Sequence, residues 1–435
     1  MNRRTFIQSS AIAMASGMTA RGANDRINVA VVGLRGRGRD HITSYSQLPE
    51  ARIAAVCDID QAQIERAVQF TEKLTGAKPQ NTYQDIRKVL ENKDIDAISI
   101  ATCNHWHALA TIWACQAGKD VYVEKPASHE IWEGRKMVEA ARKHGRMVQV
   151  GMQSRTTEHK IRAMQLLHEG AIGKVYLARG LCYKRRKSIG HQPDGPVPAG
   201  VDYNVWLGPA PMRPFNPNRF HYNWHWFWDT GNGDIGNQGV HEMDIARWGL
   251  NKPTLPDTVT CEGGKFVYDD DQETPNTELA IFKYADCELQ FEVRGLLTGG
   301  EGNVNYAADN NGFVGNLFYG SEGWMSVDLH GFQIYLGEDR KLAQEMKHVE
   351  PEEWATTPHI GNFLKAVRSR NQKDLTCDIE EGYLSAALCH MANISYRTGR
   401  KLQFDPKAER FVNDAEANSY ITRNYRRPFV VPENV

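Results

Sequence analysis

The sequence predicts an α/β protein with two sheets: an N-terminal doubly wound parallel sheet, then an α+β domain whose sheet is open and largely antiparallel. In the first third of the chain, short β-branched apolar runs alternate with amphipathic segments, a pattern typical of strands buried on both faces. After about residue 256, strand-like runs follow one another across short turns with no helix between them, which indicates antiparallel pairing. A chain of 435 residues is long enough for both domains.

Five strands and the helices between them are expected in the first domain. The two clearest helical segments are residues 61–74 and 107–118. The strands are expected at 27–33, 51–58, 95–102, 120–125 and 146–151.

The second domain is expected to begin with a helix at 158–170 and a strand at 174–184. Two late helices, 358–370 and 379–398, are expected to pack back on the first domain, and the residues after about 406 look irregular. The later strands are expected at 257–268, 277–286, 287–295, 312–320, 323–331 and 332–338.

A glycine-rich turn follows the first strand. Gly33 and Gly38 fit the first and last glycines of a dinucleotide-binding turn, with Gly36 and Arg37 between them. Arg35 occupies the position of the middle glycine, so its side chain must turn away from the phosphates or pair with them. We interpret all five residues as cofactor-binding, because a pyrophosphate would lie there on backbone N–H groups.

Asp58 ends the second strand, where a carboxylate accepts a hydrogen bond from the ribose 2′-hydroxyl of the adenosine. A carboxylate there would repel a 2′-phosphate, so the sequence favours NAD over NADP as cofactor.

Two later strand ends carry polar motifs, and both are expected to face the nicotinamide end of the cofactor, because open parallel sheets bind ligands beyond the carboxyl ends of their strands. They are Thr102-Cys103-Asn104-His105-Trp106-His107 and Glu124-Lys125-Pro126. The cofactor-binding residues expected here are Thr102, Asn104, His107, Glu124, Lys125 and, just after the fifth strand, Gln153.

In these two motifs and in the closing helix at 389–406, the chain resembles the Gfo/Idh/MocA family of oxidoreductases. The resemblance covers nearly the whole chain after the first residues, and its motifs are specific for the family, though not for a substrate. It implies a Rossmann domain that binds NAD and a second domain for substrate binding and oligomerisation.

The family has an Asp-x-x-x-His pair that lines the reaction centre with the lysine of the "EKP" triplet. Here Asn237 takes the aspartate position and His241 the histidine position. Asn cannot ionise, so the resemblance assigns the proton transfers to Lys125 and His241 and leaves Asn237 to orient them by hydrogen bonding. These three are the predicted catalytic residues.

An aromatic-rich stretch precedes Asn237. Aromatic faces suit the apolar faces of a sugar ring, and His or Asp side chains take its hydroxyls. The predicted substrate-binding residues are Tyr222, Trp224, His225, Trp226, Trp228 and Asp244. The alternative is that the tryptophans fill a core or a subunit interface.

Charge and composition limit the other sites. Lys+Arg of 52 against Asp+Glu of 53 gives a net charge of −1, so we expect no nucleic-acid partner. The basic run 184–187 is expected to be solvated or to steer an anionic ligand. No metal site and no membrane span is expected, and the eight cysteines form no C-x-x-C pair.

The first residues, with Arg3-Arg4 before a weakly apolar stretch, read as a twin-arginine export signal, which predicts a periplasmic or secreted protein. The expected division is 1–23 signal, 24–152 NAD-binding domain, 153–405 substrate and oligomerisation domain, and 406–435 tail.

The function expected is an exported NAD-dependent oxidoreductase of a sugar, glycoside or polyol, a homo-oligomer (dimer or tetramer) with tightly bound, internally recycled cofactor, since no pool of free NAD exists outside the cytoplasm. One alternative is an NAD-dependent glycosidase that works by transient oxidation and elimination. A second is a non-catalytic carbohydrate-binding module.

Overall fold

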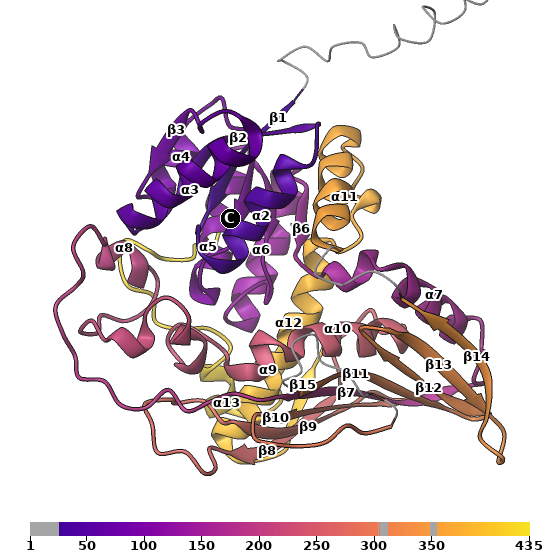
Figure 1. Ribbon diagram of the computed structural model, residues 1–435. Helices are drawn as coiled ribbons and strands as arrows, with labels where there is room; N and C mark the ends of the chain where they lie inside the picture. The colour runs from indigo at the N-terminus through magenta and orange to yellow at the C-terminus, as the bar shows by residue number, and fades with distance from the viewer. Residues whose placement is uncertain (1–25, 303, 305–311, 349–354) are drawn as a thin grey trace, which may run out of the picture.

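The computed structural model describes residues 26–302, 304, 312–348 and 355–435. The predicted export signal lies outside the described residues. Two domains lie against each other, with the parallel sheet and its helices above the second sheet in Figure 1. The predicted fold class is confirmed.

The first sheet has six strands in the order β3-β2-β1-β4-β5-β6, and every neighbouring pair is parallel. The order reverses between β1 and β4, and ligands of such sheets bind at that point, beyond the carboxyl ends of the strands. The sequence did not predict β3, which is short and has no buried residue. The strands are β1 (Ile27–Val32), β2 (Ala51–Cys57), β3 (Asn81–Tyr83), β4 (Ala97–Ile100), β5 (Asp120–Val123) and β6 (Val148–Val150).

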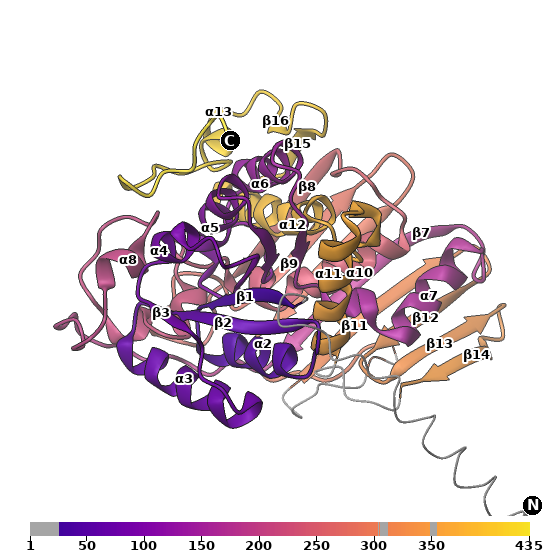
Figure 2. The same ribbon diagram turned by 90° about the horizontal axis from the view of Figure 1, so that it is seen from above.

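Helices cover both faces of this sheet, as Figure 2 shows from above. Asp60 and Asp85 cap α3 and α4 with their side chains, and Gly76 ends α3 in the left-handed conformation. The helices are α2 (Gly36–Ser46), α3 (Gln61–Thr75), α4 (Ile86–Glu91), α5 (Asn104–Gln116) and α6 (Ile131–Lys143).

The second sheet has ten strands in the order β14-β13-β12-β11-β7-β10-β9-β8-β15-β16. Only β7 and β10 pair in parallel, so the prediction of a largely antiparallel sheet is confirmed. Its strands are β7 (Val175–Lys184), β8 (Thr258–Gly264), β9 (Thr277–Lys283), β10 (Glu288–Arg294), β11 (Gly312–Gly320), β12 (Gly323–Asp328), β13 (Gly331–Leu336), β14 (Lys341–Lys347), β15 (Leu402–Asp405) and β16 (Arg410–Phe411).

One face of this sheet carries α7 (Glu158–His168), α10 (Gly239–Gly249) and α12 (Ile379–Thr398). Each of them has a helix before it in the chain: η2 (Gln153–Thr156), a short helix, precedes α7, α9 (Gly233–Asn237) precedes α10, and α11 (Thr356–Ser369) precedes α12. Figure 1 shows the opposite face of the described sheet without a helix.

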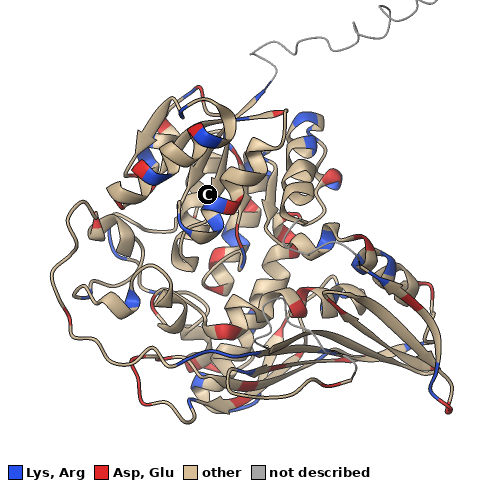
Figure 3. Cartoon of the chain, in the orientation of Figure 1, with Lys and Arg blue, Asp and Glu red and all other residues tan. Residues whose placement is uncertain are grey.

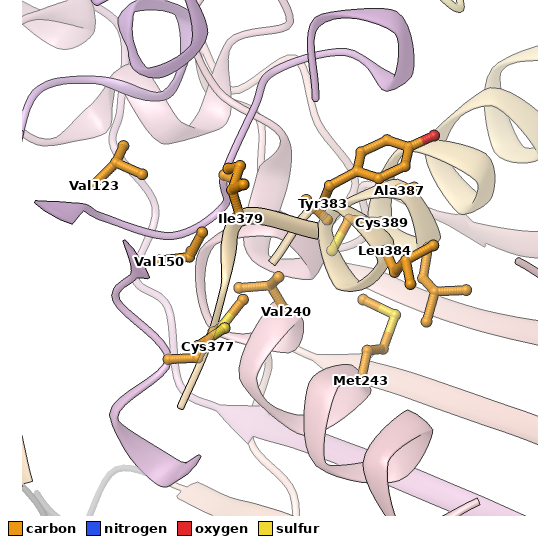
Figure 4. Close-up of a cluster of buried hydrophobic side chains, with 14 of the residues drawn as sticks. Val123, Val150, Val240, Met243, Cys377, Ile379, Tyr383, Leu384, Ala387 and Cys389 are labelled. Carbon is orange, nitrogen blue, oxygen red and sulfur yellow. The ribbon is translucent and has the colours of Figure 1, made fainter. Parts of the chain in front are cut away.

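The late helices join the two domains, as predicted. α12 packs on α6 and β6, and α11 packs on α2. Figure 4 shows the apolar cluster at this junction, where Val123 and Val150 of the first sheet meet Val240 of α10 and Ile379 and Leu384 of α12.

The residues after 406 are largely irregular, as predicted, apart from β16 and the short helix α13 (Ala415–Ser419). They return to the first domain and lie near α5 and α6 in Figure 2. The ring of Phe429 lies 5.5 Å from that of Trp106 on α5, and the backbone N–H of Trp132 on α6 donates to the carbonyl of Ile421.

A long connection between β7 and α10 runs back over the first domain. It contains α8 (Tyr203–Leu207), the short helices η3 (Pro217–Arg219) and η4 (Asn223–Trp226), and α9. We refer to residues 198–226 as the covering segment, because they contact the residues that follow β2, β3 and β4.

Candidate functional site

A cavity of about 390 Å³ lies at the carboxyl ends of β1, β2, β4 and β5, beneath the covering segment. It is therefore at the position where a Rossmann sheet binds its ligand. Its lining includes most of the predicted cofactor residues: Gly33, Arg35, Gly36, Arg37, Asp58, Thr102, Asn104, Glu124 and Lys125.

The glycine turn leaves no room for side chains at its two ends. A Cβ on Gly33, which has φ +84°, would lie 2.5 Å from the carbonyl oxygen of Ala101, and one on Gly38 would lie 1.8 Å from that of Gly33. Arg35 directly precedes α2 and is exposed, so its side chain does not fill the turn. Gly36 and Arg37 begin α2 at the cavity wall, where the backbone N–H groups of a helix N-terminus favour a pyrophosphate, so the residues present fit a dinucleotide.

Asp58 is held beside this turn. Its carboxylate accepts from the backbone N–H of Leu34 at 2.8 Å and from that of Asp60 at 3.0 Å. Burial raises the pKa of this carboxyl to about 6, although the two hydrogen bonds act to lower it. The carboxyl is therefore largely ionised at pH 7 and can accept a hydrogen bond from a ribose hydroxyl.

The covering segment is tied to the same strand ends. The carbonyl oxygen of Gly200 accepts from the backbone N–H of Gln61 at 3.0 Å and from the side chain of Gln84 at 3.0 Å. The backbone N–H of Asp202 donates to the carbonyl of Ile59 at 2.9 Å. A segment of the second domain thus closes over the side of the cavity where Asp58 would hold an adenosine.

Lys125 and Asn237 meet in the cavity. The Lys125 ammonium donates to the backbone carbonyl of Asn237 at 2.6 Å and lies 3.4 Å from its side-chain oxygen. Burial lowers the pKa of Lys125 to about 8, with Arg37 and Arg186 adding to this and Glu124 opposing it. A lysine with such a pKa is suited to exchange a proton near neutral pH.

The two domains match two models of one family. Residues 27–152 match its NAD-binding Rossmann fold, and residues 177–431, more than half of the chain, match its C-terminal α/β domain. The chain belongs to the Gfo/Idh/MocA oxidoreductase family. Its first domain is thus an NAD-binding Rossmann domain.

Curated relatives in this family include inositol 2-dehydrogenases. That of Klebsiella pneumoniae (strain 342) is 31% identical over 52% of this chain and 55% of its own length. Inositol 2-dehydrogenase 2 of Saccharopolyspora erythraea is 25% identical over 64% of this chain and 73% of its own length. The inositol 2-dehydrogenase/D-chiro-inositol 3-dehydrogenase of Shouchella clausii matches over only 43% of its length, at 30% identity.

Solved structures share the whole fold. Levoglucosan dehydrogenase, in complex with NADH and L-sorbose, superposes with a TM-score of 0.67 at 17% identity, over 87% of this chain and 99% of that one. The WlbA dehydrogenase of Bordetella pertussis, in complex with NADH and UDP-GlcNAcA, gives 0.62 at 19% identity, over 87% of this chain and 99% of that one.

In this family member Glu124 is an internal anchor as well as a wall of the cavity. Its buried carboxylate accepts from Arg37 at 2.8 Å, from His41 at 2.9 Å and from Gln153 at 3.3 Å. Burial alone would raise the pKa of Glu124, but Arg37 and His41 outweigh it and hold the pKa well below its usual value. The carboxylate fixes the backbone that carries Lys125.

Three predicted cofactor residues do not line the cavity. Gly38 packs against the carbonyl group of Gly33 and is not among the described residues that line the cavity. Gln153 is buried and its amide is shared between Glu124 and the hydroxyl of Tyr122. His107 is buried and lies between the carbonyl oxygens of Pro126 (2.7 Å) and Thr102 (3.0 Å), so it joins the two polar loops instead of facing the cofactor.

His241 is half-buried in the first turn of α10, four residues after Asn237, and is not among the described residues that line the cavity. Its role in proton transfer stays a prediction. Lys125 and Asn237 do line the cavity.

Only some of the predicted substrate-binding residues in the aromatic-rich stretch line the cavity. Tyr222, Trp224 and His225 line the cavity. Trp226 and Trp228 are not among the described residues that line the cavity. Arg186 lies over the first ring and Arg397 over the second, with guanidinium carbons 5.4 and 5.0 Å from the ring centroids. Their role in substrate binding stays a prediction.

Several residues of the covering segment that line the cavity were not predicted from the sequence. Phe220, His221 and Trp206 also line the cavity, and Trp206, Phe220, Phe215 and Trp224 form one apolar cluster. Phe220 and His221 lie within the aromatic-rich stretch and could have been included. Nothing in the sequence distinguishes Trp206.

The prediction for Asp244 is wrong. Its carboxylate is buried and accepts two bonds of 2.8 Å from Arg155 and one of 2.7 Å from Ser385. It forms an ion pair between α10 and η2 and does not line the cavity.

Charges of both signs are interspersed over the described elements, as Figure 3 shows. Among the described residues no group of three or more His, Cys, Asp or Glu side chains could hold a metal ion. The described helices include none with the length and apolar character needed to cross a membrane.

We predict that Asp244→Ala lowers the free energy of unfolding by about 3–5 kcal/mol, because it leaves the Arg155 charge buried without its main partner. Thermal and urea unfolding of the purified protein measure this. Asp286→Ala, which removes a half-exposed partner of Lys252, is the control and should cost less than about 1 kcal/mol. A loss of substrate affinity at unchanged stability would contradict the structural role.

Proposed function

We propose that the protein is an NAD-dependent oxidoreductase of a sugar or polyol that keeps its cofactor bound and recycles it in the active site. The observation that carries this proposal is the covering segment, hydrogen-bonded over the Asp58 side of a cavity whose other side holds Lys125 and Asn237. A cofactor enclosed in this way is expected to dissociate slowly.

Lys125 is the base that this mechanism requires. Bound NAD would supply the acceptor for a hydride from a carbinol carbon, and the hydroxyl on that carbon must lose a proton at the same time. The neutral amine of Lys125 takes that proton, and the carbonyl oxygens of Asn237 hold the resulting ammonium in place. In the reverse direction Lys125 returns the proton to the carbonyl oxygen of the acceptor.

The substrate class follows from the cavity wall and the relatives. Tyr222, Trp224 and His225 offer aromatic faces and a polar ring beside Lys125. Relatives named inositol 2-dehydrogenase and levoglucosan dehydrogenase support a polyhydroxylated substrate.

Export and assembly complete the proposal. The Arg3-Arg4 pair supports export of the folded protein.

Trp324 and Tyr335 stack with their ring centroids 4.5 Å apart on the sheet face without helices, and Leu342 lies beside Tyr335. This apolar surface supports a second copy of the chain docking there.

We predict that protein purified without added nucleotide releases about one NAD or NADH per chain on denaturation, measured by mass spectrometry. In Trp206→Ala, which opens the covering segment, the cofactor should be lost on dialysis. Empty wild-type protein would contradict retention. Release of a free sugar from a glycoside without net cofactor reduction would instead favour the glycosidase alternative.

We predict that Lys125→Met retains NAD but loses turnover by a factor of about 10²–10⁴, the usual contribution of a general base. Lys93→Met, at an exposed lysine that is not among the described residues lining the cavity, is the control. Steady-state kinetics with inositol and simple sugars measure the rates. Turnover close to wild type would remove Lys125 from the mechanism.

The same assignment gives a pH dependence. Oxidation of the alcohol needs the neutral amine. The kcat/KM for the alcohol substrate should therefore rise with pH through the pKa of Lys125, about 8, and then level off. A profile that falls across this range would contradict Lys125 as the base.

We predict that Arg3→Lys with Arg4→Lys blocks export and leaves folded, NAD-containing protein in the cytoplasm, measured by cell fractionation of the native host. Export of this variant at the wild-type level would contradict the twin-arginine route.

A further inference from the structure

Behind Lys125 and Asn237 lies a buried ion pair that the family motif does not include. Asp234, on α9 one turn before Asn237, accepts from Arg186 at 2.9 Å (Nε to Oδ2) and 2.6 Å (Nη2 to Oδ1). Asp234 is 2% exposed and the Arg186 side chain 17% exposed. Neither lines the cavity, so they act on a ligand only through other residues.

Arg186 belongs to the basic run 184–187, and the expectation that this run is solvated or steers a ligand does not hold for it. Its backbone N–H donates to the carbonyl of Gly295 at 2.8 Å, and its guanidinium lies over the ring of Trp226. Its two bonds to Asp234 make a planar bidentate pair, the geometry in which arginine is most specific.

The pair reaches Lys125 through Asn237. The side-chain nitrogen of Asn237 lies 3.4 Å from Oδ1 of Asp234, and its side-chain oxygen lies 3.4 Å from the Lys125 ammonium. The carboxylate can accept only from the amide nitrogen, so it turns the amide oxygen towards Lys125.

This geometry also accounts for Asn at a position where the family has Asp. An aspartate at 237 would place a second carboxylate 3.4 Å from that of Asp234, and two such groups cannot both ionise easily. With Asp234 holding the charge, the residue beside Lys125 must be a neutral donor.

We propose that the Arg186–Asp234 ion pair is a positioning unit that orients Asn237 and Lys125 and balances the charge around the lysine. Its consequence for turnover rests on the proposed function, whereas its effect on Lys125 does not. Both members act on the ionisation of Lys125: the positive charge of Arg186 lowers its pKa and the negative charge of Asp234 raises it.

Two other carboxyl groups lie near this site. The carboxylate of Glu124 is shared by Arg37 and His41, and that of Glu278, which interacts with Asp234, has a pKa raised to about 8 by burial. The described groups that interact electrostatically with Lys125 from the surrounding elements include Glu124, Arg37, His107, Arg186, His225, Asp234 and Cys389.

Removing the two members of the pair should therefore shift the Lys125 titration in opposite directions. Arg186→Gln leaves Asp234 uncompensated and should raise the pKa of Lys125, and Asp234→Asn leaves Arg186 uncompensated and should lower it, each by more than about 0.5 pH unit. Competitive acetylation of the protein as purified, across a pH series with peptide mass spectrometry, measures the pKa of Lys125 without any turnover.

The controls separate charge from structure. Arg185→Gln removes the neighbouring basic residue, whose side chain contacts Tyr268 and the carbonyl of Arg186, and should leave the titration unchanged. Arg186→Lys keeps the charge and should return the titration towards wild type. Thermal unfolding checks that each variant folds, and the isosteric Asp234→Asn carries the test if Arg186→Gln does not fold.

A Lys125 titration that is unchanged, or that shifts the same way in both variants, would overturn the positioning role. The kcat/KM profile should move with the acetylation curve in each variant. If Lys125→Met keeps its turnover, the proposed function fails while the labelling result stands. If Lys125 is essential but its pKa is unchanged in Asp234→Asn and Arg186→Gln, only the proposal of a positioning unit fails.

Discussion

The buried carboxylate of Glu124 is the contact on which the active site depends. It accepts from Arg37 of the helix that follows the glycine turn, from His41 one turn later, and from Gln153 where the first domain ends. Arg37 also donates to the hydroxyl of Thr356 at 3.1 Å, so the late helix α11 is tied to the same point. An ionised group in such a setting is stable only while its donors stay in place, and it therefore fixes the glycine turn and the strand end that carries Lys125 relative to each other.

The second domain adds to the cofactor site as well as to the substrate side. Its helices α10 and α12 share one apolar core with β5 and β6, so the two domains pack together without a break in the core (Figure 4). The covering segment then reaches past this junction to β2. The cavity is thus built from both domains, although only the first carries the recognisable dinucleotide-binding pattern.

The parts of the fold and site that could be predicted are those encoded locally. Strands buried on both faces leave continuous apolar runs, and the glycine turn and Lys125 lie next to strands that such runs identify. Asp244 was misassigned because its partner Arg155 is 89 residues away in the sequence, and Gln153 because its partners Tyr122 and Glu124 are 31 and 29 residues away. Arg186 shows the same limit: a run of four basic residues looks solvated until a buried aspartate 48 residues later is brought beneath one of them. For residues 1–25, the structure offers no such comparison.

The parts of the protein that enclose the cavity are synthesised in a fixed order. The whole parallel sheet, with its glycine turn and Asp58, is synthesised before residue 151, and the covering segment emerges only afterwards. A dinucleotide can therefore meet an open first domain during synthesis and be covered as the second domain folds over it. If the protein is exported as proposed, the concentration of NAD at the site of synthesis would determine how much of it carries the cofactor.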